Sequence, residues 1–175
     1  MKRSLIYFVV LLLIFSGCKN KPRQSSRELQ QIETSREQYM LEWNKKMSEQ
    51  QDSLFAAIAD TSVFDWVKSD NGYYYSISGS ENGAQIMTDD LVSMNYVLKT
   101  ILNIPIDTYK VRYVAGKSQD IPIGIQNCVL KMRENQKATL MLPFTLAYGV
   151  KGIPGKVAPF QPLRVEITIE KVEKR

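Results

Sequence analysis

The sequence contains no histidine, so it lacks the side chain that most often serves in acid–base catalysis near neutral pH. It has only two cysteines, Cys18 and Cys128, which leaves too few ligands for a typical zinc site. No glycine-rich nucleotide loop is visible either. We therefore expect neither a metal nor any other cofactor.

Positive charge is too sparse to indicate a protein that binds nucleic acid. The formal net charge is +5 at pH 7, and it falls to +3 without Lys2 and Arg3. Basic residues form no stripe with interleaved aromatic residues, which is the usual footprint of such a protein. We expect no nucleic acid among the partners.

An apolar run long enough to cross a membrane is also missing, but a shorter one opens the chain. It extends from Leu5 to Phe15, directly after a short positive start. A spanning helix needs about 20 such residues. A short apolar core behind positive charge is typical of a signal peptide, so we predict one over residues 1–17.

Ser16 and Gly17, two small residues, lead from this core into Cys18. A cysteine at that place resembles the lipobox of bacterial lipoproteins, although Phe15 stands where leucine is most usual. The resemblance implies cleavage before Cys18 and lipid on its thiol and new amino group. The alternatives are a plain secretory signal and an uncleaved anchor. If Cys18 is lipidated, Cys128 has no disulfide partner and is expected to be a buried free thiol.

A polar tether over residues 18–26 is followed by an N-terminal helical segment, residues 27–71. Residues 27–59 contain neither glycine nor proline, and one apolar seam is interrupted around Gln50 and Gln51. A helix of about 50 Å is expected here. The seam consists of Leu29, Ile32, Met40, Trp43, Met47, Leu54 and Ile58. Such a helix can be a stalk, pack on its own domain, or form a homodimer.

The remaining chain alternates like a sheet with one short helix. Ile125, Cys128, Val129 and Met132 are apolar and lie at i, i+3, i+4 and i+7, which predicts a short helix with one buried face. Strand patterns occupy residues 72–79, 91–98, 109–114, 138–143 and 163–172. We predict an α+β domain in which an antiparallel sheet wraps a short helix.

Four stretches resemble one known family. ATLMLPFTLAYGVKGIPG, which begins at Ala138, and PLRVEITIEKV, which ends at Val172, are similar to the C-terminal half of FKBP-type peptidyl-prolyl isomerases. IPIGIQNCVLKM looks like the short helix of that family, and NYVLKTILNIPID like its strand tyrosine and aspartate. The resemblance implies an FKBP-like domain over residues 72–175. Among its branches, the gliding-motility-associated lipoproteins of Bacteroidetes look closest.

Site residues follow from the resemblance by position. Tyr148 matches the tyrosine whose hydroxyl binds the substrate carbonyl. Tyr96 and Asp107 match the strand tyrosine and the pocket aspartate, which are expected to hydrogen-bond to each other. Ile121 falls at the residue whose backbone N–H holds the ligand, if one residue is inserted after Gly116. The apolar wall is expected to use Ile106, Val111, Pro122, Ile153 and Val165.

Three positions depart from the family pattern. Ile125 stands where the best-studied members have a tryptophan floor, Lys156 where an apolar residue is common, and Val165 where phenylalanine is usual. These departures predict a wider and less aromatic pocket.

The resemblance implies a lipid-anchored isomerase and folding factor that acts on proline-containing segments of exported proteins. Lys19, Asn20 and Lys21 include no acidic residue, which favours the periplasmic face of the outer membrane. Two alternatives remain open. One is a noncatalytic binding module, and the other is a structural lipoprotein subunit of a motility or secretion machine.

Overall fold

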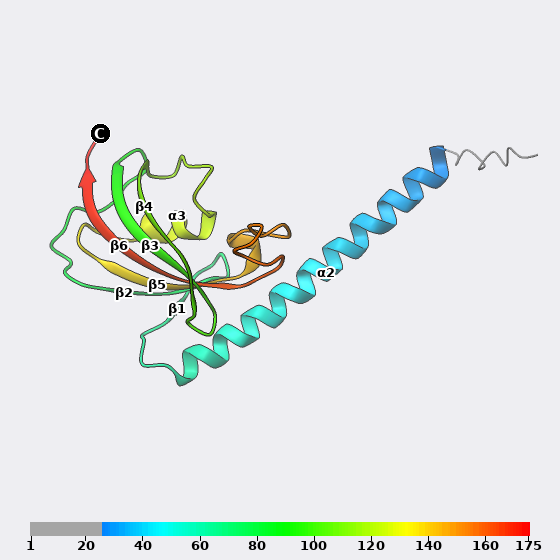
Figure 1. Ribbon diagram of the computed structural model, residues 1–175, viewed down its shortest axis with the longest axis horizontal. Helices are drawn as coiled ribbons and strands as arrows, with labels where there is room; N and C mark the ends of the chain where they lie inside the picture. Colours follow the sequence, from blue (N-terminus) through cyan, green and yellow to red (C-terminus); the bar gives the residue numbers. More distant parts are fainter. Residues whose placement is uncertain (1–25) are drawn as a thin grey trace, which may run out of the picture. The chain divides into compact units, whose positions relative to one another are not determined.

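The computed structural model describes residues 26–175, so the predicted signal peptide and Cys18 lie outside the described residues (Figure 1). Helix α2 (Ser26–Thr61) is followed by a curved sheet that holds the short helix α3 (Ile123–Val129). The chain divides into two compact units between Glu42 and Trp43. Residues 43–61 of α2 therefore belong to the same unit as the sheet.

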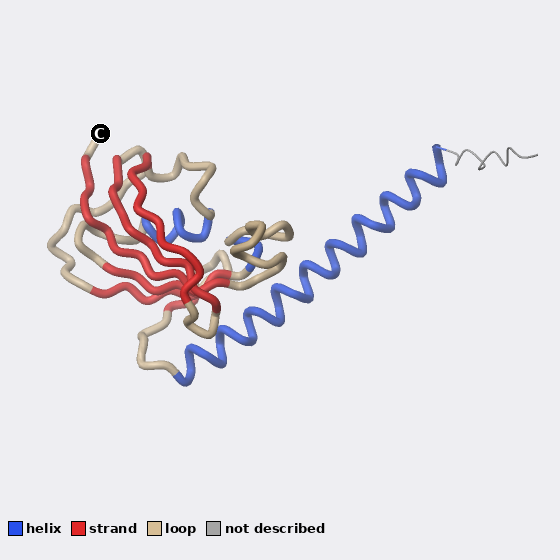
Figure 2. Tube along the Cα trace, in the orientation of Figure 1, coloured by secondary structure: helices blue, strands red, loops and turns tan. Residues whose placement is uncertain are grey.

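Six strands form one sheet, in which every neighbouring pair is antiparallel (Figure 2). Their order across the sheet is β1-β2-β5-β6-β3-β4. The strands are β1 (Val67–Lys68), β2 (Tyr74–Ser78), β3 (Leu91–Thr100), β4 (Pro105–Val114), β5 (Lys137–Leu142) and β6 (Leu163–Glu173). The last and central strands, β6 and β3, alternate between buried and partly exposed residues, as a sheet with one covered face requires.

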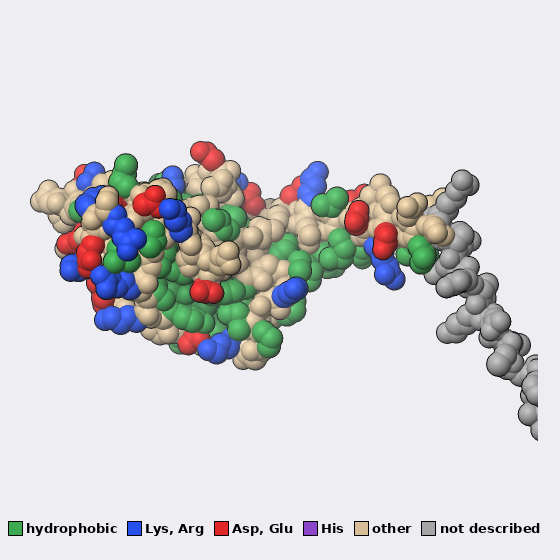
Figure 3. Space-filling model, turned by 90° about the horizontal axis from the view of Figure 1, so that it is seen from above, with side chains coloured by type: hydrophobic (Ala, Val, Ile, Leu, Met, Phe, Trp, Pro, Cys, Tyr) green, Lys and Arg blue, Asp and Glu red, His purple; other side chains and the backbone are tan. Residues whose placement is uncertain are grey.

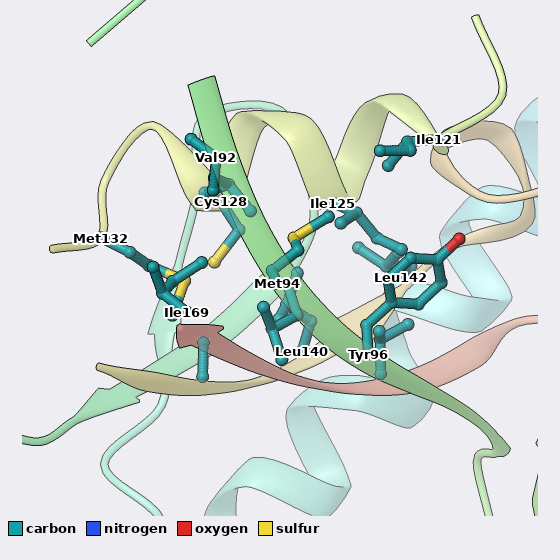
Figure 4. Close-up of a cluster of buried hydrophobic side chains, with 14 of the residues drawn as sticks. Val92, Met94, Tyr96, Ile121, Ile125, Cys128, Met132, Leu140, Leu142 and Ile169 are labelled. Carbon is teal, nitrogen blue, oxygen red and sulfur yellow. The ribbon is translucent and has the colours of Figure 1, made fainter. Parts of the chain in front are cut away.

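The main core lies between α3 and the concave face of the sheet. Ile125 and Cys128 of α3 meet Met94 and Tyr96 of β3 there, and all four are almost fully buried (Figure 4). Burial raises the pKa of the Cys128 thiol to about 12, so the thiol stays protonated and acts as a small apolar group. Gly124 permits the close approach of α3, because a Cβ there would lie 2.7 Å from a methyl of Leu142.

The outer face of the sheet is charged. Ion pairs join its strands, with Lys99 Nζ 2.6 Å from Glu166 and Arg112 2.9 Å from Glu173. Basic and acidic side chains are also interspersed over the sheet-containing unit on the face that Figure 3 shows.

A second, smaller cluster holds residues 43–61 of α2 against the sheet. Phe55 has no exposed surface and meets the ring of Tyr74 edge-on, at 6.0 Å between centroids. Met141 completes the buried set, and Trp66 packs against it. Ile58 of the expected seam packs against this cluster, whereas Leu54 is 41% exposed and its place is taken by Phe55.

The predicted fold class is confirmed: a long N-terminal helix precedes an antiparallel sheet wrapped on a short helix. Two details differ from the sequence prediction. Strand β4 begins at Pro105, four residues before the expected start, and the two-residue strand β1 was not predicted. Within residues 26–175, no helix combines the length and the apolar character that crossing a membrane requires.

Candidate functional site

Tyr148 stands on the connection between β5 and β6, residues 143–162. Pro143 has no N–H to donate to a neighbouring strand, and the chain turns there into the 3-10 helix η1 (Phe144–Leu146). Beyond Tyr148 the connection folds back on itself, and the Gly152 N–H donates to the Tyr148 carbonyl at 3.1 Å. Gly152 has φ +63, and a Cβ there would lie 2.2 Å from the Val157 carbonyl oxygen. Glycine is required at this turn.

Tyr96 and Tyr109 form an aromatic pair beside Tyr148. They lie directly opposite each other on β3 and β4, and their rings stack at 4.8 Å between centroids and 14° between planes. Cross-strand aromatic pairs of this kind stabilise a sheet. Tyr109 was not among the predicted site residues, so the site is more aromatic than the sequence suggested.

The hydroxyls of Tyr96 and Tyr148 are both kept in the neutral form. Burial is the main reason that the pKa of Tyr96 is raised to about 12, and the nearby Tyr109 adds to this increase. A hydrogen bond with Tyr148 has the opposite effect and lowers the pKa of Tyr96. Burial, followed by the influence of Tyr96, raises the pKa of Tyr148 well above its usual value near 10. Both hydroxyls hold their proton at neutral pH, as an ordinary tyrosine does, and each can donate one hydrogen bond.

Asp107 holds a different set of partners from the one expected. Lys156 Nζ lies 2.5 Å from its Oδ2, and the Thr108 N–H donates to its Oδ1 at 2.9 Å. The ion pair with Lys156, the hydrogen bond from Tyr109 and that from Thr108 lower the pKa of Asp107 in that order. The expected partner Tyr96 instead bonds with Tyr148.

The Asp107–Lys156 ion pair also joins two separate parts of the site. Asp107 belongs to β4 and Lys156 to the connection that carries Tyr148. Their side chains keep 25% and 52% of their surface exposed, so the pair sits at the surface and is screened by solvent. It fastens the connection to the sheet edge.

Most of the predicted apolar wall belongs to one cluster. Ile106, Val111, Tyr148 and Ile153 are partly buried and pack against the same core. Ile125 and Val165 are also in this core but have no exposed surface, so they lie beneath the surface of the site. Figure 4 shows Ile125 of α3 and Tyr96 of β3 in the same layer between helix and sheet.

A pocket of about 300 Å³ adjoins Tyr148. Of the predicted residues it is lined by Ile121, Pro122 and Tyr148. The Ile121 N–H, which was expected to hold a ligand, donates to the Ser118 hydroxyl at 3.3 Å. Pro122 has no N–H, so this turn offers a ligand no backbone donor at that residue.

Gln126 organises this turn and was also not predicted. Its side chain is buried, donates to the carbonyls of Ser118 at 2.9 Å and Ile121 at 2.7 Å, and accepts from the Ser118 N–H at 3.3 Å. A glutamine on the first turn of a short helix gave no sequence signal for this role. Tyr109 did give a sequence signal, because it lies two residues after Asp107 and on a strand the two side chains share a face.

The comparisons with known proteins agree with this geometry. Residues 83–170 match the family model described as FKBP-type peptidyl-prolyl cis-trans isomerase. No curated protein matched the sequence.

Three solved structures share the fold at low identity. FkpA from Escherichia coli is 19% identical, with TM-score 0.61, and the match covers 99% of this chain and 82% of that one. A peptidyl-prolyl cis-trans isomerase from Pseudomonas syringae pv. tomato str. DC3000 is 17% identical, with TM-score 0.61, over 74% of this chain and 96% of that one. AtFKBP13 is 20% identical, with TM-score 0.56, over 61% and 98% respectively.

The family model spans half of the chain and includes both strands that carry Tyr96 and Tyr109, the helix with Ile125, and the connection with Tyr148. On this evidence, the chain belongs to the FKBP-type peptidyl-prolyl cis-trans isomerase family.

Proposed function

We propose that this protein is an active prolyl cis–trans isomerase that helps exported proteins to fold. The observation that carries the proposal is the place of Tyr148, which packs partly buried against the apolar cluster and lines the adjoining pocket. A neutral phenol at this place can donate a hydrogen bond to a peptide carbonyl. Membership in the family supplies the reaction that this bond would serve.

The reaction needs no nucleophile and no metal, because it breaks no covalent bond. Rotation about an Xaa–Pro peptide bond crosses a barrier of about 18–20 kcal/mol that amide resonance sets. The twisted transition state has lost this resonance, so its carbonyl oxygen carries less negative charge. A dry apolar pocket favours that species over the planar amide in water. Each ~1.4 kcal/mol of such preference gives about tenfold in rate.

The site residues divide the work between polar and apolar groups. Tyr148 fixes the substrate carbonyl, Tyr96 orients Tyr148, and Asp107 shapes the pocket wall without transferring a proton. Tyr109 supplies an aromatic surface next to Tyr96. The proline side of the substrate would contact the apolar residues Ile106, Val111, Ile121, Pro122 and Ile153. Ile125 and Val165 are fully buried below these residues and would support them.

The test is the cis/trans exchange of a short Xaa–Pro peptide, measured by NMR with and without the full chain in detergent. We expect acceleration, and a loss of about tenfold in kcat/KM in Tyr148→Phe, because the hydrogen bond that holds the substrate carbonyl in the pocket is removed. Tyr75→Phe removes the same atom from a tyrosine on β2 and should keep full activity. Equal activity in Tyr148→Phe and wild type would remove Tyr148 from the mechanism.

A noncatalytic binding module is the second candidate, and two observations favour it. Ile125 replaces the tryptophan expected in the pocket floor and is fully buried. The Asp107–Lys156 ion pair also fastens the connection across the site. A folded wild-type chain that leaves peptide exchange unchanged, yet binds a proline-containing peptide in the same NMR spectra, would support this candidate over the enzyme.

We further propose that the protein is anchored to the cell envelope through lipid on Cys18, as in the Bacteroidetes lipoproteins that it resembles. Metabolic labelling with a palmitate analogue tests this. Label should appear in wild type and in Cys128→Ser and be absent from Cys18→Ser. Label in Cys18→Ser would contradict the anchor. Protection from protease on intact cells, lost when the outer membrane is opened, is the result expected of the periplasmic face.

The part of α2 before Trp43 is proposed as a homodimerisation arm, with residues 72–175 as the isomerase domain. Large apolar side chains on this arm are strongly exposed, including Leu29 at 47% and Ile32 at 40%. Deleting residues 27–42 should halve the mass measured by sedimentation. A monomer both before and after the deletion would refute the arm.

A further inference from the structure

Gln51 is a buried polar residue on α2 that lies within the same compact unit as the sheet. Only 5% of its surface is exposed, although glutamine is normally found at the surface. A buried amide is tolerated when its donor and acceptor are both paired. The partners of Gln51 are therefore informative.

The side chain of Gln51 bonds to both ends of the connection that carries Tyr148. Its Oε1 accepts from the Phe144 N–H at 2.9 Å, two residues after β5 ends. Its Nε2 donates to the Phe160 carbonyl at 3.0 Å, shortly before β6 begins. One side chain thus joins the start and the end of this connection.

These two bonds close a circuit with two backbone bonds. The Gly149 N–H donates to the Phe144 carbonyl at 2.8 Å, and the Phe160 N–H donates to the Gly149 carbonyl at 3.2 Å. Gly149 directly follows Tyr148. The circuit of Gln51, Phe144, Gly149 and Phe160 therefore fixes the backbone at the residue next to the proposed catalytic hydroxyl.

The backbone in this circuit is one that has to be held in place. Phe160 has φ +58 and Gly149 has φ +65, both in the left-handed region. A bulky residue such as phenylalanine adopts this region only under constraint from its surroundings. The rings of Phe144 and Phe160 contact each other at 5.3 Å between centroids, and Gln51 holds the carbonyl of Phe160.

We propose that Gln51 is a positioning residue for the isomerase site. It clasps the connection at Phe144 and Phe160 so that Tyr148 points correctly, and residues 43–61 of α2 are therefore part of the catalytic unit. The inference rests on the proposed isomerase function. It goes further by making the activity of the domain depend on its N-terminal helix.

The test compares Gln51→Ala with Gln50→Ala, which changes the same residue type at the exposed neighbouring position of the same helix. Amide hydrogen exchange and peptide isomerisation are measured on the full chain in detergent. We expect the Phe144 amide to exchange about tenfold faster in Gln51→Ala, because its acceptor is lost. We also expect kcat/KM to fall by about three- to tenfold while Gln50→Ala stays unchanged.

Val92→Ala is the control that distinguishes a general loss of stability from a displacement of the connection that carries Tyr148. Val92 is fully buried at the beginning of β3 and makes no part of the circuit. Its variant should raise exchange throughout the sheet-containing unit, whereas Gln51→Ala should raise it selectively in residues 143–162. The two variants are compared under conditions in which the same fraction of each is folded. If Gln51→Ala then loses no more activity than Val92→Ala, the positioning role is wrong.

Failure of the isomerase proposal and failure of this inference give different results. A folded wild type without activity contradicts the isomerase, and the exchange data then decide about the clasp alone. Selective loosening of residues 143–162 supports the clasp. Unchanged exchange at Phe144 in Gln51→Ala overturns it, whatever the activity. A looser connection with full activity also overturns the positioning role.

Discussion

Gly124→Ala should displace the connection that carries Tyr148. An added Cβ would lie 2.7 Å from a methyl of Leu142 and 3.0 Å from the carbonyl oxygen of Leu146. Leu142 has no exposed surface, and the Leu146 oxygen is backbone in the turn just before Tyr148. Neither neighbour can move alone.

Two effects of opposite sign decide the magnitude. Alanine is favoured over glycine in a helix by about 1 kcal/mol, and Gly124 does not have the positive φ that would cancel this gain. Overpacking a filled core costs about 1–3 kcal/mol. Because one of the two clashes is with backbone, we expect the cost to prevail, with a net loss of about 1–2 kcal/mol of unfolding free energy.

The assay is urea unfolding together with peptide isomerisation under conditions in which the variant is folded. Asn127→Ala, on the same helix, is the control that gains helix propensity without adding an atom beside Leu146. We expect Gly124→Ala to lose activity beyond its loss of folded protein. A variant that is more stable than wild type and fully active would refute the reasoning from close packing.

Three further outcomes follow from the contacts. Phe55→Ala should lower the unfolding free energy by about 3–5 kcal/mol, and Leu54→Ala should lower it by less than about 1 kcal/mol. Equal losses in the two variants would show that the buried face of α2 has been assigned wrongly. The lowered pKa of Asp107 means that its ion pair with Lys156 stabilises the fold above about pH 4 and stabilises it less as pH falls. The difference between Lys156→Met and wild type in urea unfolding should therefore be small at pH 7, because the pair is screened by solvent, and should shrink as the pH is lowered. Tyr109→Leu should weaken peptide binding more than Tyr109→Phe, which keeps the stacked ring; identical binding would exclude a role for the ring.

Local sequence patterns were sufficient for the architecture. The glycine-free stretch predicted α2, and strict alternation from Leu163 predicted β6, because each pattern is set by which neighbours share a face. The boundaries moved where pairing overrides local preference. Strand β4 reaches back to Pro105 since β3 continues opposite it, and β1 exists only through its pairing with β2.

The arrangement of the site depended on contacts that no local pattern contains. Gln51 bonds with Phe144 and Phe160, 93 and 109 residues further along the chain. In the sequence it lies among polar neighbours, so it was interpreted as part of an interruption of the apolar seam. The Asp107–Lys156 pair likewise joins a strand to a distant turn, so the bonding partner of Asp107 could not be chosen from sequence. Tyr109 could have been predicted, because it lies two residues after Asp107 and side chains at that spacing share one face of a strand.

The position of the two tryptophans has a practical consequence for spectroscopy. Trp43 lies on α2, and Trp66 lies on the segment after it, packed against the cluster of Phe55 with Arg164 5.9 Å from its ring. The isoleucine at position 125 leaves the pocket floor without an indole. Intrinsic tryptophan fluorescence should therefore respond when residues 43–61 leave the sheet and stay nearly constant when a peptide occupies the pocket. Excitation of tyrosine, or a labelled peptide, is needed to follow binding itself.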